Sequence, residues 1–262
     1  MDESISPVIT VITVVRNGAA VIDGCIRSVL EQSVPDLEYI MIDGASTDGT
    51  LDIVRGYGGA ISCVVSEPDQ GLYDAMNKGL RLARGRFVHF LNADDRYATP
   101  DTLRTLLPEL DDHFICHAQM IYVLGDGSRR VLGETFSRRR ELQASRLPQP
   151  VLFVAKQIYD QVGGFDTRYR IAADYDMVLR LTERFPTRFI ARPVTVMHAG
   201  GVSFMRPGLA FGESMQVARR HGRNKFASIW DFALKHTKWW LVQVFPQRLL
   251  TIARQSLGAK AK

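Results

Sequence analysis

An alternation of apolar runs and amphipathic segments over residues 1–91 restricts this chain to an α/β fold more strongly than any other feature. The run 8–15 is rich in β-branched residues, as expected for a strand that is covered on both faces. Further strands are expected over 37–42, 61–66 and 87–91. Helices are expected after Asn17, which we predict to be a helix cap, and over 51–57 and 73–83. This order predicts a Rossmann-like, mainly parallel central sheet with helices on both faces.

The pattern changes after residue 91. A helix is expected from Pro100 to about residue 110, and the Gly-Asp-Gly sequence at 125–127 predicts a hairpin within 121–131. A further helix is expected over 174–184, where apolar residues recur at helical spacing. A short strand over 194–197 is expected to end at His198.

The charge of the chain is distributed unevenly. Residues 201–262 contain 11 Lys and Arg and 2 acidic residues, a balance of +9, whereas residues 1–200 contain 22 basic and 26 acidic residues, a balance of −4. A basic carboxy-terminal region predicts an anionic partner, either a nucleic acid or a membrane surface. The hydrophobic content of 46% excludes disorder over most of the chain.

Cysteine spacing and hydropathy exclude several classes of protein. Cys25, Cys63 and Cys116 are far apart and form no CxxC pair, so we expect buried, reduced thiols of a cytosolic protein rather than a zinc site or a disulfide framework. The acidic amino terminus is the opposite of a secretory signal. No apolar run reaches the length of about 18 residues that a membrane-spanning helix needs.

Acidic residues follow three of the expected strands. Asp43 follows the second strand, Glu67 and Asp69 the third, and Asp94 and Asp95 the fourth. In open α/β sheets, ligands bind outside the carboxyl ends of the strands. Asp is also a common turn residue, and any one cluster would be explained in that way. Three clusters at one edge favour a site for a divalent cation or for sugar hydroxyls.

Several long motifs resemble family 2 glycosyltransferases, which have the GT-A fold. The resemblance covers about residues 8–203, and in its details it is closest to a bacterial branch used in polysaccharide and glycolipid assembly. The matching motifs are 11–17, 42–50, 66–79, 85–95, 163–166 and 171–180. The resemblance implies a GT-A domain over 1–225, with a donor half over about 1–100 and an acceptor half over about 101–225. Residues 226–262 would form a basic, amphipathic helical appendage.

The resemblance also implies roles for individual residues on the donor side. Asp43 would accept a hydrogen bond from the donor's base, and the turn 92–95 would hold manganese or magnesium on the diphosphate through Asp94 and Asp95. This turn has Asn92 where the family's DxD motif has its first Asp, which leaves open which carboxylate is the main ligand. The residues expected to bind the donor are Asn17, Asp43, Glu67, Asp69, Tyr73, Asn77 and Asp94. Helix packing would explain Tyr73 equally well.

On the acceptor side, Asp174 matches the family's catalytic base. The alternative is an Asp that stabilises a helix amino terminus through capping and dipole effects. Asp176 is the weaker candidate for the base and is expected to be structural or to bind the acceptor. His198 lies where related enzymes place a late metal or phosphate contact, although a satisfied polar residue is an equal alternative. Asp48 is expected to cap a helix rather than to bind a ligand.

The appendage combines aromatic and basic side chains. This mixture suits a helix that lies in a membrane interface, which Pro246 would break into two pieces. The alternative is a helical hairpin that packs on the body or on a second subunit. The side chains concerned are Trp230, Phe232, Lys235, His236, Lys238, Trp239, Trp240, Phe245, Arg248 and Arg254.

These patterns and the resemblance together predict an inverting, metal-dependent glycosyltransferase. It would transfer a sugar from a nucleotide-sugar, by the family's preference a UDP-sugar, to a glycan or polyprenyl-linked acceptor. We expect it in the cytoplasm, peripheral on the inner face of the plasma membrane, without a nucleic-acid partner; the oligomeric state stays open. The absence of GxGxxG after the first strand excludes a nicotinamide-dependent oxidoreductase, and the absence of a GxxxxGK(S/T) motif excludes a P-loop enzyme. A sugar nucleotidyltransferase, a nucleic-acid-binding tail and an inactive scaffold remain alternatives.

Overall fold

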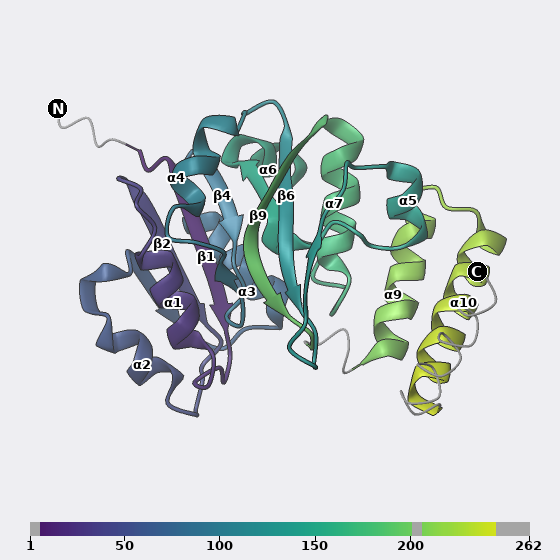
Figure 1. Cartoon of the computed structure of the whole chain (residues 1–262), viewed down its shortest axis with the longest axis horizontal. Helices are drawn as coiled ribbons and strands as arrows, with labels where there is room; N and C mark the ends of the chain where they lie inside the picture. Colours follow the sequence, from purple (N-terminus) through teal and green to yellow (C-terminus); the bar gives the residue numbers. More distant parts are fainter. Residues whose placement is uncertain (1–5, 201–205, 245–262) are drawn as a thin grey trace, which may run out of the picture.

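The computed structural model describes residues 6–200 and 206–244. Four parallel strands form one half of a nine-stranded sheet, in the order β3-β2-β1-β4. These strands are β1 (Ile9–Val15), β2 (Leu37–Asp43), β3 (Cys63–Ser66) and β4 (Phe87–Phe90). Every residue of β1 is buried, as the β-branched run predicts. The four strands expected in the first half and their parallel pairing are therefore confirmed (Figure 1).

The other half of the sheet mixes strand directions. It contains β5 (Arg96–Tyr97), β6 (Ile115–Val123), β7 (Arg129–Leu132), β8 (Leu152–Ala155) and β9 (Thr187–His198). β8 joins the two halves because it pairs antiparallel with both β4 and β6, and β6 is parallel to β9. The hairpin at 125–127 is confirmed, since it connects β6 to the antiparallel β7. The expected short strand 194–197 is wrong in length, because β9 starts seven residues earlier, at Thr187, within a stretch where charged residues interrupt the apolar pattern.

Helices lie on both faces of the parallel half. They are α1 (Ile22–Leu30), α2 (Thr50–Gly56) and α3 (Leu72–Leu82). The chain crosses from β1 to β2 and β3 in one direction and returns from β3 to β4 in the other. Because such crossovers are right-handed, the return places α3 on the face opposite α1 and α2. The reversal of direction between β1 and β4 creates a topological switch point, where α/β proteins bind ligands.

The remaining helices lie around and beyond the second half of the sheet (Figure 1). They are α4 (Thr102–Leu106), α5 (Arg138–Gln143), α6 (Lys156–Val162), α7 (Ala173–Arg184), α9 (Pro207–Arg220) and α10 (Lys225–Val244). The helix expected from Pro100 to about 110 is confirmed as α4 followed by a 3-10 turn over Leu107–Glu109, and the helix expected over 174–184 is α7. The pattern did not predict α5, α6, α9, β5 or β8.

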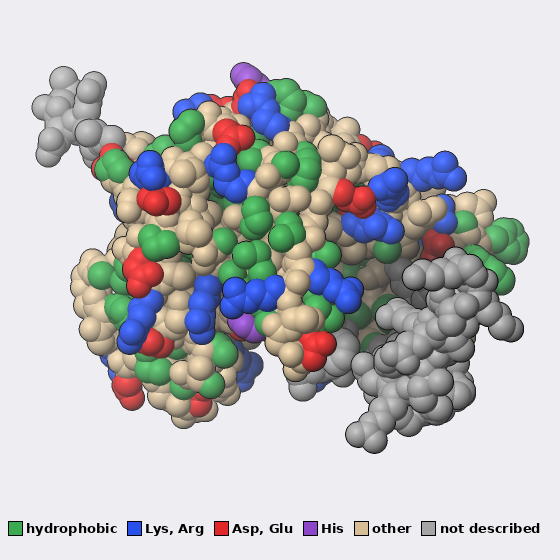
Figure 2. All heavy atoms as spheres, viewed as in Figure 1, with side chains coloured by type: hydrophobic (Ala, Val, Ile, Leu, Met, Phe, Trp, Pro, Cys, Tyr) green, Lys and Arg blue, Asp and Glu red, His purple; other side chains and the backbone are tan. Residues whose placement is uncertain are grey.

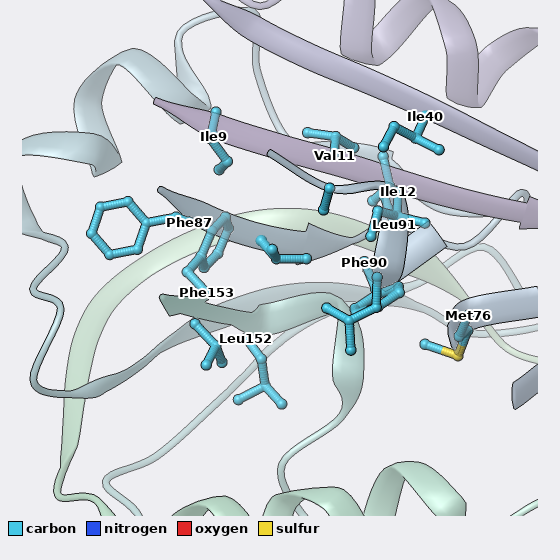
Figure 3. Packing of buried hydrophobic residues seen from close by; sticks show 14 of the residues in the cluster. Ile9, Val11, Ile12, Ile40, Met76, Phe87, Phe90, Leu91, Leu152 and Phe153 are labelled. Carbon is cyan, nitrogen blue, oxygen red and sulfur yellow. The ribbon is translucent and has the colours of Figure 1, made fainter. Parts of the chain in front are cut away.

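Aromatic and aliphatic side chains fill the core between the sheet and its helices. Phe87 and Phe90 of β4 and Phe153 of β8 are almost completely buried, and they lie near Ile9 and Ile12 of β1 (Figure 3). A Cβ atom at Gly79 would lie 2.5 Å from Ile12 Cγ2. Glycine at this helical position therefore lets α3 approach β1 closely. Because α3 directly follows β3, its amino terminus lies at the carboxyl edge of the sheet.

Two local predictions have different outcomes. Asn17 does not cap α1, because its backbone is left-handed with φ of 53° and the helix begins five residues later, after Val21. Asp48 does stabilise the start of α2, since its Oδ1 atom accepts a hydrogen bond from the Thr50 backbone N–H. The three cysteines are free thiols, two of them buried.

The basic appendage begins as predicted with a helix, α10. Pro246 and the expected break there lie outside the described residues. No helix within 6–200 or 206–244 is long and apolar enough to cross a bilayer. The proposed division into a donor half, an acceptor half and an appendage stays a prediction.

Candidate active site

Asp43 stands at the end of β2, next to the switch point, and is completely buried. Its Oδ2 atom accepts hydrogen bonds from the Ser46 backbone N–H at 3.0 Å and from the Ser66 hydroxyl at 2.7 Å. Its Oδ1 atom has no hydrogen-bond partner among the described residues. A buried acceptor oxygen without a partner costs free energy of about 1–3 kcal/mol, so this atom is a candidate for contact with a ligand donor group.

The loops after β1 and β2 are tied together around Asp43. Asn17 bridges them, because its side-chain oxygen accepts a hydrogen bond from Thr47 N–H and its own N–H donates to Ser46 Oγ. Asn17 and Ala45 both have a left-handed backbone, with φ of 53° and 55°. Non-glycine residues in this conformation often accompany functional sites. The observed contacts of Asn17 shape the site, and its binding to the donor stays a prediction.

The acidic residues after β3 are partly neutralised by Lys78 of α3. The Lys78 ammonium lies 2.9 Å from Glu67 and 3.8 Å from Asp74, and the Glu67 hydrogen bond raises the pKa of Lys78. The nearby Asp69 carboxylate accepts a hydrogen bond from Gly71 N–H and comes so close to Gly44 that a Cβ atom there would clash. Lys78, which sequence reasoning missed, therefore lies beside the loops that converge at the edge of β2 and β3.

Asp94 and Asp95 form part of a tight turn after β4. The turn is closed by hydrogen bonds from Asp95 N–H to the Asn92 carbonyl and from Asn92 Nδ2 to Asp95 Oδ2. Asp94 is exposed, whereas Asp95 is 1% exposed. Burial and then the charge of Asp94 raise the pKa of Asp95 to about 7. Asn92, the departure from the expected motif, thus orients Asp95.

His198 is brought toward this turn by the pairing of β5 with β9. Arg96 of β5 pairs with Val196 of β9 in the antiparallel register, and β9 ends two residues later, at His198. Asp94 and Asp95 directly precede β5. Binding of one cation by Asp94, Asp95 and His198 together stays a prediction.

The residues of this turn fit a divalent cation that is shared with a ligand. In the part of the chain that the structure describes, no group of three or more His, Cys, Asp and Glu side chains is placed to hold a metal ion. The Asp95 Oδ1 atom is buried and makes no hydrogen bond to any described residue. Mg²⁺ is commonly held by one or two carboxylates together with substrate phosphates, so two protein oxygens are sufficient.

Positive charge accompanies this edge of the sheet. Lys and Arg side chains form a band across the lower part of the face in Figure 2, toward which β1 and β2 point in Figure 1. Carboxylates beside such a band suit an anionic ligand that is bound together with a cation.

Asp174 lies in the first turn of α7 and connects to the parallel half through Tyr73 of α3. The Tyr73 hydroxyl lies 3.1 Å from Asp174 Oδ1 and 2.6 Å from the Ile171 carbonyl oxygen. Burial raises the pKa of Asp174, while hydrogen bonds from Tyr175 N–H and Tyr73 oppose that effect. A carboxylate with a raised pKa that is held in place on a helix can act as a general base.

Tyr73 and Asn77 join the two parts of the molecule. The Asn77 amide donates to the Phe165 carbonyl at 2.9 Å and accepts from Phe165 N–H at 2.7 Å, and the Tyr73 ring stacks on the Phe165 ring. The alternative of helix packing therefore describes the observed contacts of Tyr73. Donor binding by Asn77 stays a prediction.

Glu213 of α9 organises the segment that precedes Asp174, and the sequence offered no signal for it. Its buried carboxylate accepts hydrogen bonds from the backbone N–H groups of Arg170, Ile171 and Ala172, at 2.8–3.0 Å. Backbone donors can come from any residue type, so no motif marks this contact. Glu213 thus fixes the approach to α7 from about 40 residues away.

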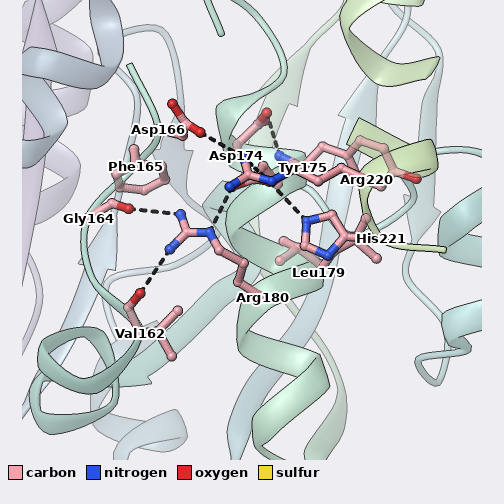
Figure 4. A network of polar contacts seen from close by, with 12 residues as sticks. Val162, Gly164, Phe165, Asp166, Asp174, Tyr175, Leu179, Arg180, Arg220 and His221 are labelled. Atoms are coloured by element: carbon pink, nitrogen blue, oxygen red, sulfur yellow. Dashed lines mark hydrogen bonds and ion pairs between the residues drawn. The ribbon is translucent and has the colours of Figure 1, made fainter. Parts of the chain in front are cut away.

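Asp176 is structural, as one of its two predicted roles proposed. Its buried carboxylate accepts hydrogen bonds from Arg180 at 2.7 Å and His221 at 2.9 Å. Arg180 also donates to the Val162 and Gly164 carbonyl oxygens (Figure 4). These bonds connect α7 to the carboxyl end of α6 and, through His221, to the end of α9.

Comparison with known proteins places this geometry in context. The model of glycosyl transferase family 2 matches residues 10–169. A PGL/p-HBAD biosynthesis glycosyltransferase of Mycobacterium bovis is 32% identical over 180 residues, covering 67% of this chain and 70% of that protein.

Two solved structures resemble the fold. S. aureus TarS 1–349 in complex with UDP-GlcNAc has a TM-score of 0.66 and 19% identity, covering 87% of this chain and 71% of that one. This chain spans 43% of the longer TarS chain. The mannosyltransferase PcManGT from Pyrobaculum calidifontis, in complex with GDP-Man and Mn²⁺, has a TM-score of 0.64 and 20% identity, covering 98% of this chain and 81% of that one.

Proposed function

The chain belongs to glycosyl transferase family 2, and on this premise we propose that it is an inverting, metal-dependent glycosyltransferase that uses a UDP-sugar. The observation that carries the proposal is the placement of three carboxylates. Asp43 ends β2 and Asp95 lies in the turn after β4, and these are the two strands that flank β1. Asp174 is connected to the same edge of the sheet by its hydrogen bond with Tyr73. This arrangement provides a donor site and a base from opposite parts of the fold.

Asp43 would recognise the base of the donor. Its buried Oδ1 atom, which accepts no hydrogen bond from any described residue, suits the single imide N–H of uracil. The Ser46 and Ser66 hydrogen bonds hold the other oxygen, so the carboxylate is already oriented before the nucleotide binds. The TarS structure with UDP-GlcNAc supports this choice, while PcManGT with GDP-Man makes guanine the competing base.

Asp94, Asp95 and His198 would hold Mn²⁺ or Mg²⁺ against the diphosphate. When bound, the cation neutralises the charge that develops on the leaving nucleoside diphosphate. The protein's own contribution is orientation, because Asn92 fixes Asp95, and β9, which ends at His198, pairs with the short strand that follows Asp95. The Mn²⁺ of PcManGT supports this assignment.

Asp174 would act as the base in a single displacement. An acceptor hydroxyl attacks the anomeric carbon as the bond from that carbon to the diphosphate oxygen breaks, and the hydroxyl proton passes to Asp174. Attack from the side opposite the leaving group inverts the anomeric configuration. Such general-base assistance contributes about 10²–10⁴-fold in rate.

The test is a thermal-shift panel of UDP, GDP, dTDP and CDP, each with and without Mn²⁺. We expect UDP to raise the Tm only with Mn²⁺, because selective binding to the folded state stabilises it. Asp174→Asn should retain this shift and lose transfer. A protein that no nucleotide stabilises would contradict the donor site, and near-normal turnover by Asp174→Asn would contradict the base.

We propose in addition that the enzyme works at the inner face of the plasma membrane, in the synthesis of a cell-surface polysaccharide or glycolipid. One side of α10 exposes Phe226, Ile229, Trp230 and Leu234, with exposed fractions of 80%, 45%, 67% and 43%. The spacing of these residues places them on one helical face. Aromatic side chains next to basic ones suit an anionic membrane interface.

Vesicle sedimentation tests this second proposal. Phe226→Asp combined with Trp230→Asp should abolish binding to anionic vesicles, whereas Leu82→Asp, which changes a 41% exposed leucine on α3, should leave it intact. Equal sedimentation of all three proteins would contradict a membrane role for α10.

A sugar nucleotidyltransferase receives no support from the loop after β1. Gly18, its one supporting glycine, is explained by packing, because a Cβ atom there would lie 2.6 Å from Val15 Cγ2.

A further inference from the structure

A cavity of about 550 Å³ lies on the side of β6 and β7 that faces α5, apart from the carboxyl-edge loops that contain Asp43 and Asp95. This volume is typical of sites for small molecules or for the apolar part of a larger one. Its walls come from the middle of β6, from β7 and the loop after it, from α5, and from residues 145–151. None of the predicted site residues lines it.

The walls of the cavity include exposed apolar side chains. Val131 and Leu132 of β7 are 55% and 40% exposed, and they line the cavity with Met120 of β6 and Phe136. Water-exposed aliphatic side chains in a concave site favour an apolar occupant, because burying them releases about 25 cal/mol per Å².

The exposed charged side chains of the same walls are two arginines and one glutamate. Arg140 and Arg146 share one carboxylate, that of Glu134, at 2.7 Å and 3.2 Å. The other acidic residue of the wall, Glu141, is 2% exposed, and its carboxylate accepts hydrogen bonds from the Arg146 backbone N–H. Two exposed guanidinium groups therefore share a single exposed carboxylate, which suits an occupant with an anionic group.

The cavity adjoins the first turn of α7. The Tyr175 hydroxyl donates a 2.7 Å hydrogen bond to the Glu141 carbonyl oxygen, and Tyr175 directly follows Asp174. The negative charge of Asp174 also contributes to the raised pKa of Glu141. The wall of the cavity is therefore joined directly to the helix turn that carries the carboxylate that we assign as the base.

We propose that this cavity binds the acceptor, and that the acceptor is an amphipathic molecule with an anionic group. Its apolar part would lie against Val131 and Leu132, and its phosphate or other anionic group would pair with Arg140 and Arg146. The assignment as acceptor site rests on the proposed transferase function, whereas the preference for an amphipathic anion rests on the cavity alone.

Calorimetric titration with three probes tests the preference without requiring catalysis. The probes are octyl phosphate below its micelle threshold, octyl glucoside, which lacks the anion, and inorganic phosphate, which lacks the chain. We expect octyl phosphate to bind at least about 10-fold more tightly than either of the others, the ratio that about 1.4 kcal/mol of added interaction produces.

Two variants and their controls locate the binding. Leu132→Asp and Arg146→Gln should each weaken octyl phosphate binding about 10-fold. The matched controls are Val64→Asp, a 42% exposed valine on the other edge strand, β3, and Arg104→Gln, which removes a surface arginine paired with Asp101. Both controls should bind like the unchanged protein.

The outcomes separate this inference from the proposed function. Equal affinity for octyl phosphate and phosphate, or equal loss in variants and controls, would overturn the cavity assignment. If octyl phosphate binds as expected but no nucleotide stabilises the protein, the cavity is retained and the transferase proposal fails. If octyl phosphate also competes with transfer and Leu132→Asp relieves the competition, the cavity is the acceptor site.

Discussion

The Tyr73 hydroxyl lies 3.1 Å from the Asp174 carboxylate, although 101 residues separate the two in the chain. Tyr73 lies in the first turn of α3, which packs on β1 and β2, and Asp174 lies in the first turn of α7, beyond β8 and β6. This contact, together with the Asn77–Phe165 clamp, connects the nucleotide side of the proposed site to the base. It also lowers the pKa of Asp174, so it should affect how the proposed transfer depends on pH.

Tyr73→Phe should shift the pH dependence of transfer. Its hydroxyl lowers the pKa of Asp174, against the larger opposing effect of burial, so its removal raises that pKa further. Because a base must be unprotonated, we expect the acidic limb of the kcat/KM profile to move to higher pH. At the acidic end, the variant should be about 10-fold slower, consistent with the loss of one hydrogen bond to a charged group. An unchanged profile would separate Asp174 from the proton transfer.

Asp95→Asn should remove a pH dependence of stability. The pKa of Asp95 is about 7 in the folded protein and 3.8 in the reference state, so the folded protein binds the additional proton between these values. The free energy of unfolding therefore falls as pH rises from 3.8 to about 7. At pH 8 without metal, we expect the variant to have a Tm about 2–4 °C higher for each kcal/mol recovered. Thermal unfolding at pH 5 and pH 8 measures this difference, and Asp52→Asn, at an exposed site on α2, is the control.

Asp43→Asn should weaken nucleotide binding selectively. The amide can present its NH₂ group where the carboxylate presents Oδ1, so it no longer provides two acceptor oxygens. We expect at least about 10-fold weaker UDP binding by calorimetry. Ser66→Ala, which removes only a hydrogen bond to the other oxygen, should weaken it less. If both variants bind UDP with native affinity, Asp43 does not contact the base.

Asn77→Asp distinguishes a clamp from a donor contact. The carboxylate cannot donate to the Phe165 carbonyl oxygen, so we expect a loss of about 1–3 kcal/mol in the free energy of unfolding. If Asn77 serves only as a clamp, the Kd for UDP should stay within about 3-fold of the original value, less than one hydrogen bond would cause. A large change in Kd at unchanged stability would instead confirm the predicted donor role.

Glu213→Gln should affect the base without contacting the substrate. The NH₂ group of glutamine opposes the backbone N–H groups of Arg170 to Ala172, so the segment before α7 loses part of its support. We expect kcat to fall while the Kd for UDP is retained, and Tm to fall by about 2–4 °C per kcal/mol lost. Glu183→Gln, which changes an exposed glutamate on α7, is the matched control. Equal loss in both variants would show that the effect is general to charge removal.

Local residue patterns predicted the parallel half of the sheet because its interactions are local. β1 and β2 are buried on both faces and are apolar runs in the sequence, and the helix between them, α1, has an amphipathic repeat. The carboxylates of Asp43, Asp94 and Asp95 follow directly from the strand ends. The resemblance to family 2 then identified Asp174, whose position no periodicity explains.

The second half of the fold was harder to predict because its strands depend on neighbours that are distant in the chain. β9 contains Arg188, Arg192 and Pro193 with a register irregularity beside β6, so its apolar pattern is interrupted. β5 has only two residues, too few for any period. These strands are stabilised by pairing with neighbours distant in the chain, which a local pattern does not record.

The sequence by itself determined the α/β class, the parallel half of the sheet and the carboxylates at its edge, because side-chain period and strand-end position are properties of neighbouring residues. Only the tertiary structure decided that Tyr73 touches Asp174, that Glu213 supports the segment before α7, and that Asn77 clamps Phe165. The cavity beside α5 likewise exists only in the folded chain. These contacts join backbone and side-chain groups about 40 to 100 residues apart, and their geometry is set by how the helices pack on the sheet.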